Sequence, residues 1–131
     1  MALLRHECLH GQSHFDWMLG RVSSCADPNA RVVRAFRCNQ RVDTTPPPFE
    51  IQLEPLPDHR WFYLTLVTAH DLSHERGTVW PVAAGLWRSG PPSDAGLDES
   101  IEIQFNHSHA RHLLRITSSC SLVWASTASV P

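Results

Sequence analysis

The sequence predicts a single all-β domain over residues 1–131, a small β-barrel of about eight short strands. Short stretches rich in β-branched and aromatic residues recur along the chain, and several alternate strictly between apolar and polar side chains. Gly, Pro, Asn and Asp separate these stretches, as turns require. No stretch has a sustained helical period with caps. A length of 131 residues with 42% hydrophobic content suffices for one core and suggests no second domain.

The chain opens with a predicted strand pair that can bring two histidines together. Residues 2–4 are a short apolar run that leads to His6, and residues 11–13, Gly-Gln-Ser, supply a turn. The chain can therefore reverse direction after His6 and place this side chain beside His14.

Residues 14–19 form the stretch around which the predicted site is organised. Side chains of a β-strand alternate between its faces, so His14, Asp16 and Met18 share one face. Together with His6, two imidazoles and one carboxylate are a common ligand set for a divalent metal that keeps positions open for water or substrate. An H-x-D triplet also occurs by chance, so a strand without a metal is the alternative. The other face is apolar and can pack, with Phe15, Trp17 and Leu19.

Three further strands are predicted in the middle of the chain. Residues 31–38 have the β-branched content of a strand, and residues 49–54 alternate apolar and polar side chains until Pro55 and Pro57 end the pattern. Residues 61–67 are the most aromatic and apolar run and are predicted to form a central strand.

The last part of the chain is also predicted to be strand-rich. A tight turn at residues 76–78 precedes a strand at 79–82, and residues 85–87 begin another short extended piece. Residues 100–105 alternate cleanly. Residues 112–117 and 121–124 are predicted to form a closing hairpin around Ser118, Ser119 and Cys120.

Charge and cysteine usage restrict the possible functions. Eleven Arg, no Lys and thirteen acidic residues give a net charge of −2, which argues against coating nucleic acid by bulk electrostatics but allows a grip on one nucleic-acid end. The four Cys form no C-x-x-C pair, so free thiols are expected. Neither a leader peptide nor a membrane span is indicated, and a cytoplasmic location is expected.

A set of short motifs resembles the 3′-phosphoesterase domain of bacterial DNA ligase D and the small stand-alone proteins of that family. The resemblance covers roughly residues 3–87 in order and spacing, whereas the C-terminal third agrees only in being strand-like. The motifs are Arg5-His6-Glu7, the stretch 14–19, Pro57-Asp58-His59 with Tyr63, Arg76-Gly77-Thr78-Val79 and Gly85-Leu86-Trp87.

This resemblance implies an enzyme that removes a terminal ribonucleotide and then the 3′-phosphate from DNA 3′ ends. It implies that His6, His14 and Asp16 bind a divalent metal, usually manganese with zinc as the other candidate, and that His59 and Tyr63 contact the scissile phosphate. A metal so held can polarise a phosphoryl oxygen and activate water, while a nearby His can bind the phosphate or protonate the leaving oxygen. The implied partners are the 3′ end of DNA or a primer-template, and a DNA ligase or polymerase.

Two features depart from the family pattern. Met18 stands where the family usually has an Arg, a natural bidentate clamp for phosphate. Arg37 or Arg76 could supply a substitute cation. Only five residues precede His6, whereas the ligase-fused domains have a longer arm used in ribonucleotide removal. This difference favours simple 3′-phosphatase chemistry, weak activity or no activity. Met18→Arg is expected to raise activity, unless Met18 packs in an apolar interior.

Three alternatives remain open at the level of sequence. One is a catalytically degenerate relative that binds DNA ends or a repair partner without turnover. Another is an iron and 2-oxoglutarate oxygenase, although those enzymes place H-x-D after several strands of a larger barrel, and here it begins at residue 14. The third is a structural barrel with no site.

Overall fold

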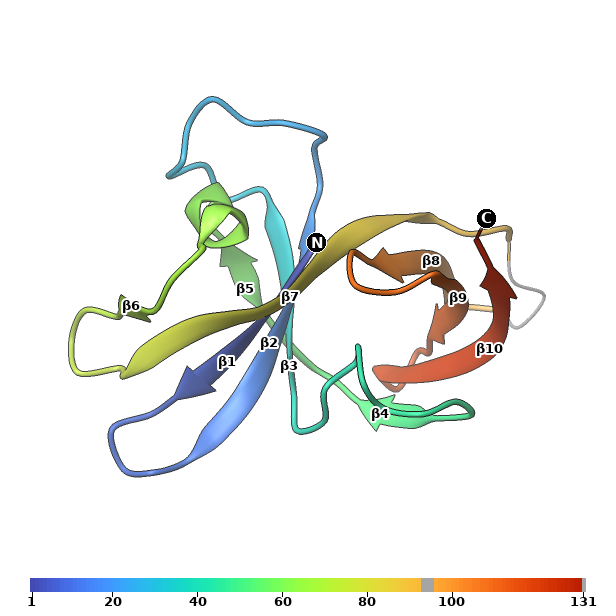
Figure 1. Cartoon of the computed structure of the whole chain (residues 1–131), viewed down its shortest axis with the longest axis horizontal. Coiled ribbons are helices and arrows are strands. Elements are labelled where there is room, and N and C mark those ends of the chain that lie inside the picture. The colour runs from blue at the N-terminus through green and yellow to red at the C-terminus, as the bar shows by residue number, and fades with distance from the viewer. Residues whose placement is uncertain (93–95, 131) are drawn as a thin grey trace.

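The computed structural model describes residues 1–92 and 96–130, and the chain folds as an all-β protein, as predicted (Figure 1). Within the described residues the only helix is one short 3₁₀ turn, η1 (Trp61–Thr65). The strands are β1 (Ala2–Glu7), β2 (Ser13–Gly20), β3 (Val33–Cys38), β4 (Glu50–Gln52), β5 (Glu54–His59), β6 (His70–Asp71), β7 (Thr78–Ser89), β8 (Glu99–Phe105), β9 (Ala110–Ile116) and β10 (Ser121–Ser129).

The strands form one antiparallel sheet of ten strands in the order β4-β10-β9-β8-β7-β1-β2-β3-β5, with β6 added beside β7. The 12-residue β7 joins two halves, because its first part pairs with β1 and its last part pairs with β8. Figure 1 shows it crossing from one half to the other. The sheet is not closed into a barrel, since the path ends at β4 and β5 and no pairing joins these two strands among the described residues.

The two ends of the sheet lie next to each other in the sequence. Only Leu53 separates β4 from β5, yet β4 pairs with β10 and β5 pairs with β3 at the opposite end of the path. The prediction that Pro55 and Pro57 end the strand is wrong, because β5 contains both. Proline lacks the N–H of a ladder and is tolerated where one side of a strand has no partner.

Strict alternation in β1 and β2 sorts side chains between two cores. The first core lies between the two halves of the sheet and includes Leu3, Trp17, Phe36, Ile103, Leu114 and Leu122. The second core lies on the other face of β1, β2 and β3 and includes Ala2, Leu4, Met18, Val33, Ala35, Tyr63 and Val79. Three residues of η1 cover the second core, namely Trp61, Phe62 and Leu64.

The aromatic run at residues 61–67 is the largest error of the sequence prediction. Its first five residues form η1, and Val67 is 86% exposed. The aromatic side chains of this run are not equally buried: Tyr63 is buried, whereas Trp61 and Phe62 are half-buried. The stretches predicted at 79–82 and 85–87 are parts of the continuous β7. The hairpin predicted at the end of the chain is present as β9 and β10.

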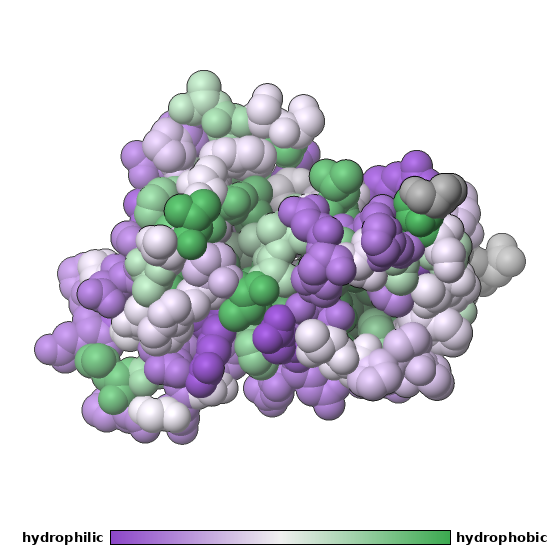
Figure 2. Space-filling view, in the orientation of Figure 1, coloured by the Kyte–Doolittle hydropathy of each residue, from purple (hydrophilic) through white to green (hydrophobic). Residues whose placement is uncertain are grey.

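The surface is mixed in character. Figure 2 shows hydrophobic residues as separate patches among hydrophilic ones on the face in view. Cys8, Cys25, Cys38 and Cys120 are free thiols, as expected. Across residues 1–92 and 96–130, no helix has the length and apolar character needed to cross a membrane.

Candidate metal centre and phosphate pocket

The register of β1 and β2 places the predicted metal ligands on one face. His6 lies directly opposite His14, and Leu4 lies opposite Asp16 in the same ladder. On this face the apolar side chains of the second core occupy one end of the strands, and the polar side chains follow at the other end. Arg37 of β3 lies opposite Asp16 in the next ladder, so its side chain is on the same face. The alternation that places the second core on this face therefore also places the polar side chains of the predicted site on it.

Seven sequence-predicted site residues line a single pocket of about 200 Å³, which we call the histidine pocket. Its floor is apolar and comes mainly from the second core, with Met18, Leu56, Leu72 and Val79. Its polar lining consists of His6, His14, Asp16, Arg37, His59, Tyr63 and Arg76.

The three expected ligands have the spacing of a metal site. His6 Nδ1 lies 3.1 Å from His14 Nε2 and 3.6 Å from Asp16 Oδ2, and His14 Nε2 lies 3.2 Å from Asp16 Oδ1. Donors bound to one ion at about 2.0–2.2 Å are about 3.0–3.5 Å apart. Asp16 Oδ1 is buried and has no hydrogen-bond partner, although it lies 3.2 Å from His14 Nε2. A buried carboxylate oxygen without a partner is costly unless a cation completes it, so these residues fit a divalent metal.

A backbone carbonyl orients the His6 ring. His6 Nε2 lies 2.7 Å from the carbonyl oxygen of Arg76, which can only accept, so Nε2 carries the proton. Nδ1 then has a lone pair aimed toward His14 and Asp16. An imidazole whose second nitrogen donates to a carbonyl is the usual support for a metal-binding histidine.

Gly77 allows this carbonyl to reach His6. The residue has φ +95°, and a Cβ at this position would lie 1.9 Å from the backbone oxygen of Glu7. Only glycine permits both this φ and such a close approach between the start of β7 and the end of β1. The Arg-Gly pair at 76–77 is therefore part of the support for the candidate metal centre.

Electrostatics favour a neutral His14. Burial lowers the pKa of His14, and the nearby Arg37 guanidinium and His6 lower it further, while Asp16 acts in the opposite direction. A neutral imidazole is the form that binds a metal, because the lone pair of the ring nitrogen must be available.

His59 and Tyr63 meet at the pocket although residues 61–67, which include Tyr63, do not form the predicted central strand. His59 ends β5, and Tyr63 lies in η1, with ring centroids 5.7 Å apart in an edge-to-face contact. His59 Nδ1 lies 2.7 Å from the carbonyl oxygen of Pro57, so Nδ1 carries the donor proton and Nε2 is available to a ligand. The Tyr63 hydroxyl accepts a 3.4 Å hydrogen bond from Arg60.

Both predicted substitute cations reach the pocket. Arg37 Nε is buried without a hydrogen-bond partner, and Arg37 Nη1 lies 3.7 Å from Glu54 Oε2. Arg76 is exposed, and its guanidinium donates to the carbonyl and hydroxyl oxygens of Ser73 at 2.9 and 3.1 Å. Met18 is 1% exposed and belongs to the second core, so an arginine at this position would have to emerge from an apolar environment.

A wider basic groove adjoins the histidine pocket. It has a volume of about 710 Å³, shares His59, Tyr63 and Arg76 with the pocket, and adds the side chains of Arg31, Arg60 and His74. Asp58 is the only acidic residue in its lining among the described residues, and Asp58 Oδ1 accepts a 3.1 Å bond from Arg21. A separate hollow of about 290 Å³ over β7 and β8 has no imidazole or thiol in its described lining.

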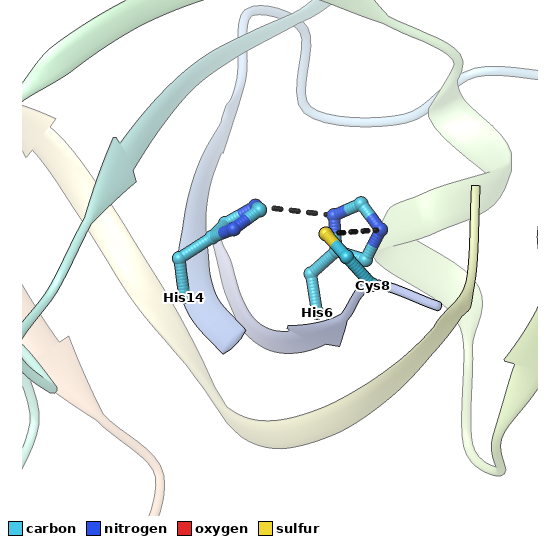
Figure 3. A group of neighbouring side chains, drawn as sticks. All are labelled: His6, Cys8 and His14. Carbon is cyan, nitrogen blue, oxygen red and sulfur yellow. Dashed lines mark hydrogen bonds between the residues drawn. The ribbon is translucent and has the colours of Figure 1, made fainter. Parts of the chain in front are cut away.

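Sequence reasoning missed Cys8 as a candidate ligand. The ligand atoms of His6, Cys8 and His14 all lie within 4.8 Å of one another, so these three residues form a second candidate group that shares both imidazoles with the first (Figure 3). Cys8 follows His6 by two residues and thus continues the same face, as Asp16 does after His14. This H-x-C spacing is the signal that could have identified Cys8, and it lies outside the C-x-x-C pattern of common cysteine sites.

Comparisons of this chain with protein-family models, with curated proteins and with solved structures find no match. The function of the protein must therefore be inferred from the residues of the chain and from their geometry.

Proposed function

We propose that this protein is a metal-dependent 3′-end-processing phosphoesterase, in the first place a 3′-phosphatase, that prepares DNA ends in the cytoplasm for a ligase or polymerase. The observation that carries the proposal is the convergence of a two-imidazole, one-carboxylate ligand set with His59, Tyr63 and two arginines in one pocket. A phosphate monoester needs this combination, because it must be held as an anion while one of its P–O bonds breaks.

His6, His14 and Asp16 would hold the divalent ion, with manganese as the main candidate and zinc as the second. When bound, such an ion supplies a Lewis acid for a phosphoryl oxygen and lowers the pKa of a water. Three protein ligands leave positions open for this chemistry. Asp16 also offsets part of the positive charge that the arginines bring to the pocket.

His59 would act on the phosphate or on the leaving oxygen. Because Nδ1 donates to the Pro57 carbonyl, Nε2 is the nitrogen at which a proton can be gained or lost. In the protonated form, Nε2 can donate to a phosphate oxygen or protonate the 3′ oxygen as the P–O bond breaks. The Tyr63 hydroxyl, polarised by Arg60, would donate a second hydrogen bond to the phosphate.

The basic groove would hold the nucleic-acid strand that leads to the 3′ end. Its arginines, Arg31, Arg60 and Arg76, give it local positive charge although the net charge of the chain is −2. Arg31 and Arg60 donate to the Asp58 carbonyl and to the Asn29 side-chain oxygen at 3.2 Å, which leaves other guanidinium N–H groups for phosphates. A local groove of this kind suits recognition of one end rather than of a long duplex.

The second candidate is a relative of the enzyme that binds DNA ends or a repair partner without turnover. The burial of Met18 favours it, because the position that would carry a phosphate clamp is filled by a core side chain. The loss of one charge-assisted donor costs about 1.5–3 kcal/mol, so the enzyme hypothesis predicts weak activity and this alternative predicts none.

Turnover with added metal separates the two candidates. Purified protein is incubated with a 3′-phosphorylated primer-template in Mn²⁺, and the release of inorganic phosphate is compared with a reaction in chelator. Release that depends on Mn²⁺ and disappears in His14→Ala supports the enzyme. Binding of the 3′-phosphorylated primer-template without release of inorganic phosphate supports the second candidate.

A further inference from the structure

Cys8 belongs to the same cluster as the proposed metal ligands. Cys8, His6 and His14 each offer a ligand atom within 4.8 Å of the other two (Figure 3). The Cys8 Sγ also lies 3.9 Å from His6 Nε2, the nitrogen that faces the Arg76 carbonyl. Cys8 is only partly buried and lies just after β1, where the backbone of the β1–β2 turn is fixed by a 2.8 Å bond from Cys8 N to Gln12 O. The thiol is therefore accessible, and its backbone is held in place.

Two of the other thiols, those of Cys25 and Cys38, differ from Cys8. Cys38 is 2% exposed, points its Sγ at the carbonyl of Phe15 at 3.7 Å, and belongs to the first core. Cys25 donates to the carbonyl of Asp27 at 3.2 Å in the loop between β2 and β3. Neither approaches the imidazole pair closely enough to join the cluster within the described chain.

Asp16 lies beside the two imidazoles of this cluster and offers a carboxylate donor. Its side chain is 6% exposed, and its Oδ1 has no hydrogen-bond partner although it lies on the face that carries His6 and His14. Two imidazoles, a thiol and a carboxylate are four donors of the kind that surrounds tetrahedral zinc. Nitrogen and sulfur ligands of one zinc ion lie about 3.5 Å apart, and the Cys8 Sγ lies within 4.8 Å of a ligand nitrogen of each imidazole. Cys8 therefore has to move by on the order of 1 Å, which rotation about its χ1 bond can provide.

We propose that Cys8 is a metal ligand of this centre, and that through it the site binds thiolate-preferring ions such as Zn²⁺ as a closed His6–Cys8–His14–Asp16 set. Soft thiolates favour zinc, whereas manganese favours oxygen and imidazole ligands, so Mn²⁺ uses His6, His14 and Asp16 and keeps open positions. When zinc binds, the S–H proton passes to solvent and a Zn–S bond forms. The inference rests on the metal-binding part of the proposed function. It implies that bound zinc inhibits the proposed phosphatase activity, because four protein ligands leave no position for water.

Cobalt(II) provides a direct probe of this ligand set, because a sulfur ligand adds a charge-transfer band in the near ultraviolet that nitrogen and oxygen ligands do not give. Co²⁺ is titrated into the full chain, into Cys8→Ser and into Cys25→Ser as the matched control. The band is expected in the wild type and in Cys25→Ser and is expected to be lost in Cys8→Ser. Competition with a chromophoric chelator measures the Zn²⁺ affinity of each protein. Loss of an outer-shell partner lowers metal affinity roughly 10- to 100-fold, and loss of the direct ligand in Cys8→Ser should lower it by at least as much. Mn²⁺ affinity should be unchanged.

Three results would overturn the proposal. Wild-type protein that binds Co²⁺ without the sulfur band excludes Cys8 as a ligand and leaves the His6–His14–Asp16 centre intact; this result does not depend on the folding of any variant. Wild-type protein that binds neither Co²⁺ nor Mn²⁺ removes the metal centre and the proposed function together. Cys8→Ala serves as a second variant, and Zn²⁺ binding by a folded Cys8→Ala as tight as in the wild type would also contradict the assignment.

Discussion

His6 Nε2 lies 2.7 Å from the carbonyl oxygen of Arg76, a residue 70 positions later in the chain. The contact joins the end of β1 to the turn before β7, and it determines which nitrogen of His6 faces His14 and Asp16. The candidate metal centre thus depends on a backbone contact that Gly77 makes possible.

The first prediction concerns Gly77. Gly77→Ala should destabilise the fold by about 1–3 kcal/mol, because the new Cβ meets the Glu7 carbonyl in a left-handed conformation. Gly11 has φ +81°, and a Cβ added there would have nothing within 4 Å, so Gly11→Ala isolates the backbone cost of about 1 kcal/mol. Chemical denaturation measures both, and metal titration should show weaker binding only in Gly77→Ala. Equal losses in the two variants would show that the close approach to Glu7 is unimportant.

The second prediction separates metal binding from folding at Asp16. Asp16→Asn should melt at the same temperature as the wild type or higher in chelator, because a buried carboxylate oxygen without a partner is removed. Added Mn²⁺ should raise the melting temperature of the wild type and not of Asp16→Asn. A variant that unfolds early in chelator would instead identify Asp16 as a structural residue.

The third prediction concerns the phosphate. His59→Ala and Tyr63→Phe should keep the fold, since His59 is half-buried at the end of β5 and Phe preserves the ring of Tyr63 in the second core. Both should weaken sulfate or phosphate binding, measured by calorimetry in the presence of Mn²⁺. A loss of several kcal/mol of stability in His59→Ala would indicate a structural histidine. His109→Ala, outside the histidine pocket, serves as the control.

The fourth prediction is a pH dependence away from the site. Burial raises the pKa of Asp43, but hydrogen bonds from Arg41 and His107 outweigh burial and hold it below its ordinary value of 3.8. A lowered carboxyl pKa stabilises the fold above pH 3.8, and this contribution is lost as the pH falls through the lowered value. Asp43→Asn should therefore cost about 1–3 kcal/mol at pH 7, with the difference shrinking in acid. A constant difference between neutral and strongly acidic pH would contradict this explanation.

The sequence was sufficient for the parts of the fold that depend on alternation. Period-two patterns predicted β2 and β8 and placed His14 and Asp16 on one face, because a strand with one buried face permits a single register. The return of His6 to His14 followed from the short connection between two apolar strands. These predictions needed only local chemistry.

Other features depend on long-range contacts and could not be predicted locally. Residues 61–67 have strand propensity, but tertiary packing of Tyr63 against the second core selects a 3₁₀ turn. The open sheet, in place of a closed barrel, reflects how β4 and β5 pair with opposite ends of the path. The support of His6 by the Arg76 carbonyl joins residues that no pattern connects. Cys8 had a local signal in its H-x-C spacing, but its closeness to His14 required the fold.

The most direct test of the central claim is the Mn²⁺-dependent release of phosphate from a 3′-phosphorylated primer-template by the wild type and by His14→Ala, with metal content measured in the same samples. The proposed function predicts one equivalent of bound Mn²⁺ and slow phosphate release in the wild type, with both lost in a folded His14→Ala protein. Equal Mn²⁺ binding by the two proteins, or no release by a fully metal-loaded wild type, would contradict it.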